Sequence, residues 1–362
     1  MSIEWVIQNL RQLIEIPSLS REENQTADFL ENLIRKEGLE PSRSGNNVWV
    51  ISPHFHPSKP SVLLNSHHDT VKPNASYSRD PWKADLIGDQ LFGLGSNDAG
   101  GSLICLLATF LHFKNRTDLP FNLIWAGTAE EEISGKNGVE SILPLLPPIN
   151  LGIVGEPTGM DLAVSEKGLL VLDVCIFGKA GHAARQEGVN AIYEALPVLE
   201  WFRTYEFPQV SPFLGPMRMQ VTQIEAGTQH NVVPDTCRFT VDVRVTDAYT
   251  LEETLSIIRS HVPGECNPRS VRLRSSRISL DHPIVQAGIQ MGKNTYGSPT
   301  LSDQALMPFT TLKIGPGQSA RSHTADEFIL ISELKSGILE YISLLENYVI
   351  LLTKGSPINQ TI

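Results

Sequence analysis

The sequence predicts an α/β protein in which a large α/β domain, built from both ends of the chain, is interrupted by a smaller α/β insertion. Up to residue 167, short β-rich runs alternate with helical patterns, as is typical of a sheet covered on both faces. From about residue 168 the signals follow the order βαββαβ of a ferredoxin-like unit. Helix and strand patterns then resume. We therefore place the large domain at residues 1–167 and 278–362 and the insertion at 168–277.

The large domain opens with two predicted helices. The first has one apolar face, made of Ile3, Val6, Ile7, Leu10, Leu13 and Ile14. The second begins at a capping box formed by Ser20 and Glu23 and ends at Gly38. The later predicted elements of this domain are strands at 46–52, 60–65, 121–127, 150–155 and 309–315, helices at 100–113, 135–146 and 282–292, and a last helix with Leu334, Ile338, Tyr341, Leu345 and Tyr348 along one face.

The insertion contains four predicted strands and two predicted helices. In chain order they are a strand at 169–178, a helix at 188–202, strands at 217–224 and 237–245, a helix at 249–262 and a strand at 270–276. In the third strand apolar residues alternate with polar ones, which places Arg238 and Arg244 on the polar face. For Arg238, a position on the solvent-exposed face of the sheet is a sufficient explanation.

Composition limits the classes of function. The net charge of −11 argues against nucleic acid or an anionic membrane as the main partner, because both require a basic surface. The start of the sequence lacks the features of a signal peptide, and the longest apolar stretch is too short to span a bilayer. The cysteines are scattered without any C-x-x-C, which is typical of free thiols in a reducing compartment. We therefore expect a cytoplasmic protein.

Polar side chains follow the predicted strands at the points where these strands end. The residues in question are His67, His68 and Asp69 after 60–65, Glu130, Glu131 and Glu132 after 121–127, Glu156 after 150–155, and His323 after 309–315. Asp98 lies in "GLGSNDAGG", where a loop opens a helix. Open α/β sheets bind ligands beyond the carboxyl ends of their strands. Any one of these residues alone is explained equally well as a solvated side chain, but solvated residues have no reason to gather at one edge.

Five of these side chains form a candidate metal-binding set: His67, Asp98, Glu132, Glu156 and His323. Imidazole and carboxylate ligands without thiolates suit zinc, cobalt or manganese. Because a carboxylate can bridge two metals, five side chains can serve two ions and leave positions open for water. The set therefore predicts a catalytic metal centre.

Five spaced motifs contain these polar residues: "SHHDTVKP", "GLGSNDAGG", "GTAEEEISG", "VGEPT" and "RSHTADEF". In order and over nearly the whole chain, they resemble the motifs of the di-zinc amidohydrolase and metallopeptidase family (M20). This family includes acetylornithine deacetylase, succinyl-diaminopimelate desuccinylase and carboxypeptidase G2. The sequence is most similar to the acetylornithine deacetylase-like enzymes of Bacteroidetes. The resemblance implies a zinc-exopeptidase-like α/β catalytic domain with an inserted ferredoxin-like lid and dimerisation domain.

The resemblance also implies a role for each motif residue. His67, Asp98 and Glu156 would hold one Zn²⁺ and Asp98, Glu132 and His323 the other, with Co²⁺ as a substitute. Asp69 would orient His67, and Glu131 would be the general base. His68 takes the variable place of the H-x-D pattern and is better explained as a bystander. Glu130 is not assigned to catalysis.

Further assignments concern the substrate. The resemblance implies that Arg244 and Asn231 grip the substrate carboxylate, that Gly315 and Gly317 form a loop around it, and that His182 reaches the active site of a partner subunit in a homodimer. "GPGQSA" also fits the loose G-x-G-x-x-A dinucleotide fingerprint. Pro316 removes a backbone donor there, and no acidic residue follows on a second strand, which argues against nucleotide binding. Ser302 and Asp303 either line a pocket or cap a helix.

The function implied is hydrolysis of an N-acyl amino acid, either N-acyl-ornithine or N-acyl-citrulline in arginine biosynthesis. The resemblance leaves open whether the acyl group is acetyl or succinyl. Two alternatives remain: a dipeptidase or aminopeptidase of the same family, and a catalytically silent metal-binding protein on this scaffold. The presence of Glu131 beside a full ligand set weighs against the silent protein.

Overall fold

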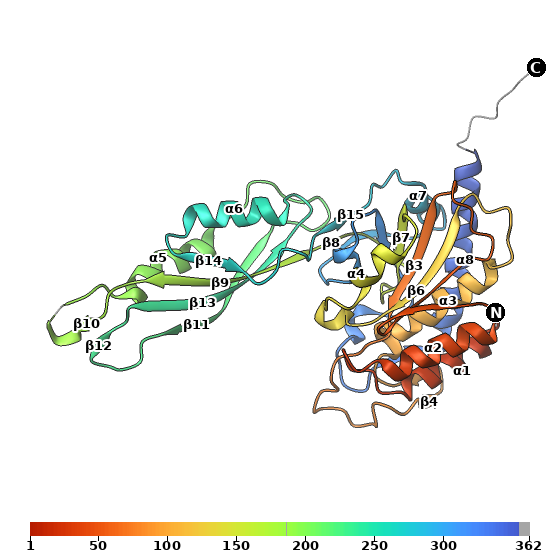
Figure 1. Ribbon diagram of the computed structural model, residues 1–362, viewed down its shortest axis with the longest axis horizontal. Helices are drawn as coiled ribbons and strands as arrows, with labels where there is room; N and C mark the ends of the chain where they lie inside the picture. The colour runs from red at the N-terminus through yellow and green to blue at the C-terminus, as the bar shows by residue number, and fades with distance from the viewer. Residues whose placement is uncertain (186, 355–362) are drawn as a thin grey trace, which may run out of the picture. The chain divides into compact units, whose positions relative to one another are not determined.

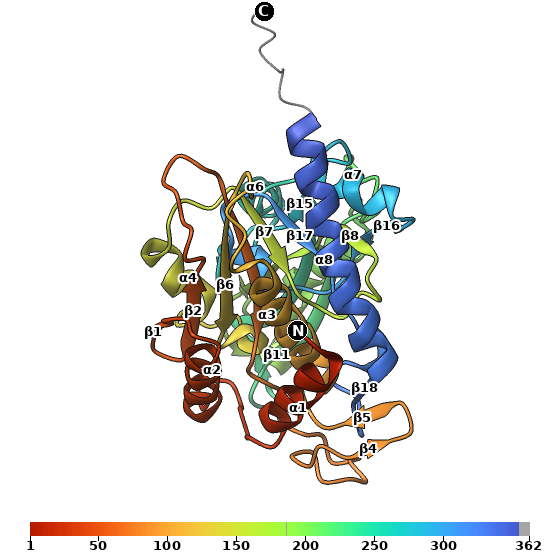
Figure 2. The ribbon, with the colours of Figure 1, turned by 90° about the vertical axis from the view of Figure 1, so that its right-hand side faces the viewer.

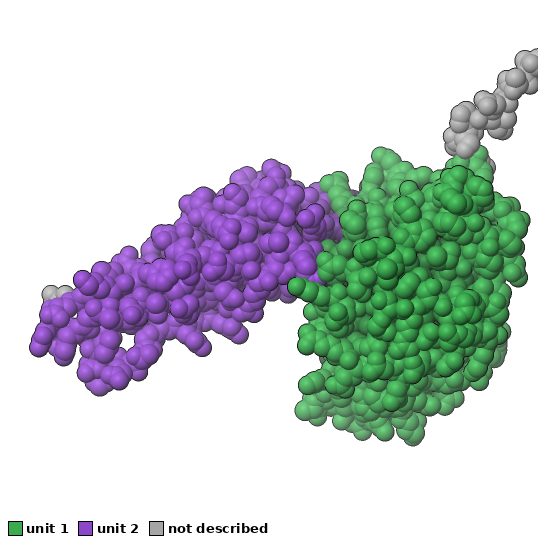
Figure 3. Space-filling model, in the orientation of Figure 1, with its two compact units in different colours: residues 1–164, 277–296, 302–362 green, residues 165–276, 297–301 purple. Residues whose placement is uncertain are grey.

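The computed structural model describes residues 1–185 and 187–354. The chain forms two compact units (Figure 3): unit 1 consists of Met1–Val164, Arg277–Tyr296 and Ser302–Ile362, and unit 2 of Ser165–Ser276 and Gly297–Leu301. Residues 297–301, which we predicted in the large domain, thus belong to unit 2. One reason is that the backbone N–H of Lys167 donates to Ser298 O.

A mixed sheet is the frame of unit 1. Its main path is β1-β2-β6-β3-β7-β17-β8-β15, and β16 pairs with β8. The strands are β1 Ser42–Ser44, β2 Asn47–Ile51, β3 Ser61–His67, β6 Asn122–Thr128, β7 Leu151–Val154, β8 Leu162–Glu166, β15 Ser276–Arg277, β16 Thr295–Ser298 and β17 Thr311–Lys313. A small sheet of β4 Leu86–Ile87, β5 Gln90–Phe92 and β18 Phe328–Leu330 completes the strands of this unit.

Four adjacent strands, β6, β3, β7 and β17, are parallel, so their carboxyl ends meet at one edge. The register places Asn65 opposite both Ala126 and Val154, and Val154 opposite Lys313. The chain moves from β3 to β6 on one side and then to β7 on the other side. This reversal creates the crevice at which open α/β sheets bind ligands.

Helices cover both faces of the sheet in unit 1. On one face α3 (Gly101–Phe113) contacts β3, β6 and α8 (Ile331–Lys354), and Figure 2 shows α3 and α8 crossing in front of the sheet. On the other face Val139 and Ile142 of α4 (Val139–Ile142) pack on Leu63 and Ile124. The other α-helices in the described part of unit 1 are α1 (Ile3–Ile14), α2 (Asn24–Lys36) and α7 (Pro283–Gln290). None of the described helices is long and apolar enough to cross a membrane.

Two predicted elements of unit 1 differ from the structure. The α-helix expected at 135–146 is reduced to α4, followed by a short 3₁₀ helix at Leu143–Leu145, because Pro144 cannot continue the helix. The capping box of Ser20 and Glu23 is wrong. α2 begins at Asn24, Glu23 makes no side-chain cap, and the hydroxyl of Ser20 donates to Asp69 instead.

In its described part, unit 2 has a four-stranded antiparallel sheet in the order β11-β13-β9-β14 and two α-helices (Figure 1). The strands of this sheet are β9 Gly168–Phe177, β11 Arg218–Ala226, β13 Thr236–Val245 and β14 Glu265–Pro268, and the α-helices are α5 Ala191–Thr204 and α6 Leu251–His261. The predicted ferredoxin-like order is therefore observed, but its last strand lies at 265–268 rather than 270–276. Cys266 of β14 is buried in the core of this unit, which fixes the earlier segment as the strand.

Candidate metal centre

The sheet of unit 1 delivers three of the predicted ligands to one edge. His67 is the last residue of β3, Glu132 lies in a short 3₁₀ helix that follows β6, and Glu156 follows β7 by two residues. Because these strands are parallel neighbours, residues that follow their carboxyl ends lie close together. The position of each ligand is thus a consequence of the strand order.

Asp98 lies between the two histidines. It belongs to an irregular helical turn at Ser96–Gly100, directly before α3, and its peptide bond to Ala99 is cis. Asp98 Oδ1 is 3.3 Å from His67 Nε2, and Asp98 Oδ2 is 3.6 Å from His323 Nε2. The two oxygens of one carboxylate therefore face two different imidazoles.

The other two predicted ligands complete a set around each histidine. Glu156 Oε1 is 3.8 Å from His67 Nε2, and Glu132 Oε2 is 3.0 Å from His323 Nε2. Ligand atoms of His67, Asp98 and Glu132 all lie within 4.8 Å of one another. The structure thus brings all five predicted ligands together as two groups that share Asp98, and this donor set fits two divalent cations.

Asp69 contacts the ring nitrogen of His67 that does not face Asp98. The Asp69 carboxylate is fully buried and lies 3.4 Å from His67 Nδ1, which also lies 3.0 Å from the carbonyl oxygen of Asp69. That oxygen can only accept, so Nδ1 carries the proton and the lone pair of Nε2 faces Asp98 in the neutral ring. The carboxylate of Asp69 also accepts hydrogen bonds from the backbone N–H groups of Glu131 (3.0 Å) and Glu132 (3.2 Å) and from the hydroxyl of Ser20 (2.7 Å).

Negative charge accumulates at this edge. Burial raises the pKa of Glu131 well above its ordinary value, and the carboxylates of Glu156 and Glu132 add to the rise. Burial alone would lower the pKa of His67, but Glu131, Asp69 and Asp98 outweigh it and raise that pKa well above its ordinary value. The hydrogen bond to Glu132 raises the pKa of His323 to about 9. Divalent cations would balance this charge, which is a second reason why the residues fit a metal pair.

The neighbouring residues His68 and Glu130 have structural contacts. His68 Nε2 donates to Asn46 O (2.9 Å), and His68 Nδ1 lies 2.8 Å from Thr26 Oγ1. Burial lowers the pKa of His68 to about 4, which keeps the ring neutral. The Glu130 carboxylate accepts from the side-chain amide of Asn137 at 2.9 Å. These contacts support the interpretation of His68 as a bystander and of Glu130 as noncatalytic.

Two further carboxylates, Asp303 and Glu327, lie at this edge, and neither was predicted as part of the metal centre. Asp303 accepts from Thr128 Oγ1 (2.6 Å) and Asn65 Nδ2 (3.0 Å), and thus joins the ends of β6 and β3. Ser302 precedes a short 3₁₀ helix at Asp303–Leu306 but makes no side-chain cap. Glu327 is the second-last residue of the quoted motif "RSHTADEF", and its position there was the available signal.

The loop that contains Gly315 and Gly317 packs against the loop that carries Glu156. The amide of Gly315 donates to Thr158 Oγ1 at 3.0 Å, and Gly317 O accepts from Gly159 N at 2.7 Å. A Cβ at Gly315 would come within 2.5 Å of Glu156 O, and Gly317 has a φ of +89°. These contacts explain both glycines by close packing, and their substrate role remains a prediction.

The predicted substrate residues of unit 2 form two separate groups. His182 ends β10 (Gly181–His182), which pairs with β12 (Val232–Val233), and Ala183 N donates to Asn231 O at 3.1 Å. His182 and Asn231 are therefore neighbours, and both are exposed. Arg244 lies near the opposite end of β13, where its guanidinium bonds both oxygens of Asp242 at 2.8 and 3.0 Å.

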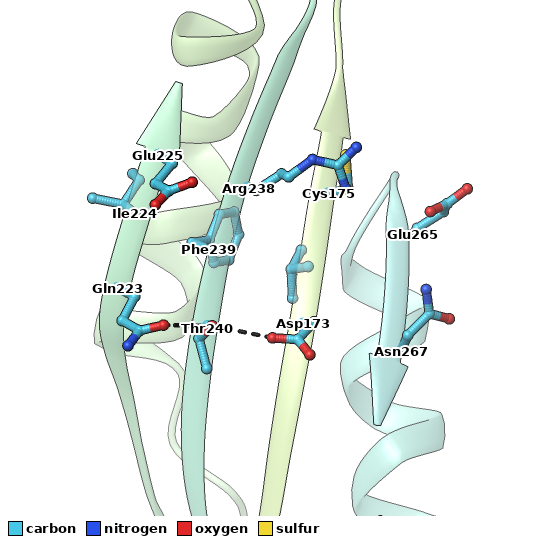
Figure 4. A pocket seen from close by; sticks show the side chains of 11 residues that line it. Asp173, Cys175, Gln223, Ile224, Glu225, Arg238, Phe239, Thr240, Glu265 and Asn267 are labelled. Carbon is cyan, nitrogen blue, oxygen red and sulfur yellow. Dashed lines mark hydrogen bonds between the residues drawn. The ribbon is translucent and has the colours of Figure 1, made fainter. Parts of the chain in front are cut away.

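A hollow of about 660 Å³ lies on the open face of the unit 2 sheet (Figure 4). Its polar lining includes Asp173, Thr240, Arg238 and Glu265. Thr240 donates to Asp173 at 3.1 Å, so part of this lining is satisfied internally. The hollow contains none of the predicted ligands, all of which belong to unit 1.

Comparisons with known proteins identify relatives over most of the chain. The family model described as the peptidase dimerisation domain of M20 proteins matches residues 164–269. A succinyl-diaminopimelate desuccinylase of Rickettsia bellii is 23% identical over 365 residues, which cover 92% of this chain and 90% of that protein. A probable carboxypeptidase of Paracoccidioides lutzii is 28% identical, with 93% of this chain and 84% of that protein covered.

The fold has solved counterparts. The Bacillus subtilis protein YXEP, described as a dinuclear metal binding peptidase from the M20 family, superposes with a TM-score of 0.71 at 17% identity, and the match covers 97% of this chain and 99% of that one. The chain is thus similar to proteins of the M20 family. The predicted similarity to this family and the predicted fold class, an α/β domain with an inserted smaller domain, are therefore confirmed.

The position of Asp69 generates a first prediction. Asp69→Asn places an NH₂ group where one of the two backbone amides, or the hydroxyl of Ser20, now donates, and it weakens the hold on His67. We expect zinc affinity to fall by about 10- to 100-fold, the usual effect of losing a partner that orients a ligand. Zinc content at buffered free zinc measures this, with Asp173→Asn in unit 2 as the control. Wild-type zinc affinity in Asp69→Asn would contradict the assigned role.

Proposed function

We propose that this protein is a zinc-dependent hydrolase that removes the acetyl or succinyl group from an N-acyl amino acid. The observation that carries the proposal is the placement of Asp98 between two groups of ligands with Glu131 beside them. N-acyl-ornithine and N-acyl-citrulline are the proposed substrates, which would place the enzyme in arginine biosynthesis and in the cytoplasm. Similarity of the quoted motifs to acetylornithine deacetylase-like enzymes supports this choice.

The chain provides a base and the groups that hold it. Two bound zinc ions would supply Lewis acidity to the acyl carbonyl and to the attacking water. Glu131 Oε2 lies 3.9 Å from His67 Nε2, and the backbone of Glu131 is fixed by Asp69. Glu131 would take a proton from the water at Oε2 and give it to the leaving amine nitrogen. Its raised pKa, caused first by burial, suits a group that must carry a proton between these steps.

The separation of the unit 2 residues supports a homodimer. His182 and Asn231 lie beyond the start of β13, and Arg244 is its ninth residue (Figure 1). Eight residues of extended strand span about 26 Å, which is more than one small substrate covers. If all three side chains contact the same substrate, they come from different subunits. The family match to a dimerisation domain and the exposed apolar residues Ile192, Tyr193 and Leu196 of α5 agree with this.

A peptidase is the second candidate. The Paracoccidioides lutzii relative is called a probable carboxypeptidase, and the ligand set serves hydrolysis of either kind of amide. The Rickettsia bellii relative, a desuccinylase by name, supports removal of an acyl group. A silent scaffold is disfavoured because Glu131 stands beside a complete ligand set.

A substrate panel tests the function directly. Acetyl and succinyl groups are each joined to ornithine, citrulline and diaminopimelate, and dipeptides are added. Metal-stripped protein is assayed before and after zinc or cobalt is restored. We expect hydrolysis of an N-acylated ornithine or citrulline that depends on added metal. Hydrolysis of dipeptides alone would select the second candidate, and full turnover without metal, verified by elemental analysis, would refute both.

The adjacent glutamates should respond differently to loss of charge. Glu131→Gln should keep both metals and lose at least about 100-fold in kcat, the usual scale for a general base. Glu132→Gln should lose metal, because its oxygen belongs to the group around His323. Kinetics together with metal analysis separate the two cases, and the reverse pattern would show that the roles are exchanged.

The proposed role of His182 in a partner's site predicts complementation. Glu131→Ala and His182→Ala subunits are unfolded together and refolded at random, so that about half of the dimers are mixed. One site in each mixed dimer then has both groups, and about a quarter of the wild-type activity should return. No recovery, with subunit exchange verified by mass, would remove the role in trans.

A further inference from the structure

The turn that carries Asp98 has backbone amides that face a buried carboxylate. Gly95 precedes the turn with a φ of +77°, a left-handed conformation that favours glycine. A side chain at Gly95 would also collide with Thr70, since its Cβ would lie 2.6 Å from Thr70 Cγ2. The amides of Gly95, Asn97 and Asp98 all donate to the same partner, Glu327.

Glu327 is only 2% exposed, and both of its oxygens are used. Oε1 accepts from Asn97 N at 2.8 Å and from Asp98 N at 2.9 Å, and Oε2 accepts from Gly95 N at 3.2 Å. A buried carboxylate is unfavourable unless donors surround it, and three backbone amides provide them here. One side chain therefore fixes the backbone on which Asp98 is mounted.

The segment that contains Glu327 also carries His323. His323 and Asp326 have φ values of +59° and +53°, a conformation that is unfavourable for residues other than glycine and persists only where contacts hold it. Those contacts are present: Asp326 Oδ1 accepts from Ser78 N at 2.9 Å and Arg79 N at 3.0 Å, and Asn74 Nδ2 donates to His323 O at 3.3 Å. Residues 323–327 are therefore held on both sides.

We propose that Glu327 is a positioning residue that sets the Asp98 carboxylate between the two ligand groups and fixes its spacing from His323. The inference rests on the proposed metal centre. Glu327 bonds the backbone of Asp98, while His323, four residues before Glu327, faces the Asp98 carboxylate at 3.6 Å. A shift of the turn would change the distances from Asp98 to both His67 and His323, so the loss of Glu327 should affect binding of a metal pair.

The test compares Glu327→Gln with the wild-type protein and with Asp89→Asn. Glutamine keeps the volume but turns its NH₂ group toward at least one amide that now donates to a carboxylate oxygen. Asp89 also accepts a backbone N–H, from Ser332 at 3.1 Å, without touching the turn, and so controls for the loss of a carboxylate that binds an amide. Zinc bound per subunit is measured against buffered free zinc, together with the melting temperature of metal-stripped protein.

We expect Glu327→Gln to bind its second zinc about 10- to 100-fold more weakly than the wild-type protein, while Asp89→Asn binds normally. Activity of Glu327→Gln should return as free zinc is raised. Wild-type zinc affinity combined with a lowered melting temperature would show a purely structural role and overturn the proposal. If Glu327→Gln does not fold, Glu327→Asp is read by the same criteria. Failure of the wild-type protein itself to bind zinc would instead refute the proposed function.

Discussion

The parallel pairing of β6, β3, β7 and β17 is the constraint on which the rest of the site depends. Parallel neighbours end at the same edge, and here three of the four strands have an acidic or histidine residue at or shortly after their end. The strand pairing alone therefore places His67, Glu132 and Glu156 close together. A change of register by one residue in β3 would turn His67 to the opposite face of the sheet and separate it from Asp98.

The gathering of carboxylates at this edge has an electrostatic consequence. Asp69, Asp98, Glu131, Glu132 and Glu156 lie around two imidazoles, and these five side chains are at most 12% exposed. Like charges in a poorly solvated region repel one another, so part of the stability of the edge depends on compensation. Backbone amides compensate Asp69, and metal cations would compensate the others. Folding and metal binding are thus linked through the same side chains.

The sequence predicted the structure correctly where apolar residues form a regular pattern and where polar residues follow the end of a strand. The strands around 61–67, 122–128 and 151–154 were predicted, and so was the proximity of the five candidate ligands, because apolar runs and the polar residues after them lie next to each other in the chain. The capping box at Ser20, the strand at 270–276 and the long helix at 135–146 were wrong, because each local signal competed with a tertiary contact or a proline. Glu327 was missed because a carboxylate that binds backbone amides leaves no periodic pattern.

The surroundings of Asp69 and Glu131 shift the pKa values of these two carboxylates in opposite directions. Burial raises the pKa of Asp69, but its contacts with His67 and Ser20 more than reverse this, so its pKa falls below the ordinary value. Glu131 is buried among other carboxylates, and its pKa rises. Neighbouring acids whose pKa values are driven apart are suited to different tasks. In the proposed mechanism, Asp69 would remain an anion that orients the ring of His67, and Glu131 would be the group that exchanges a proton.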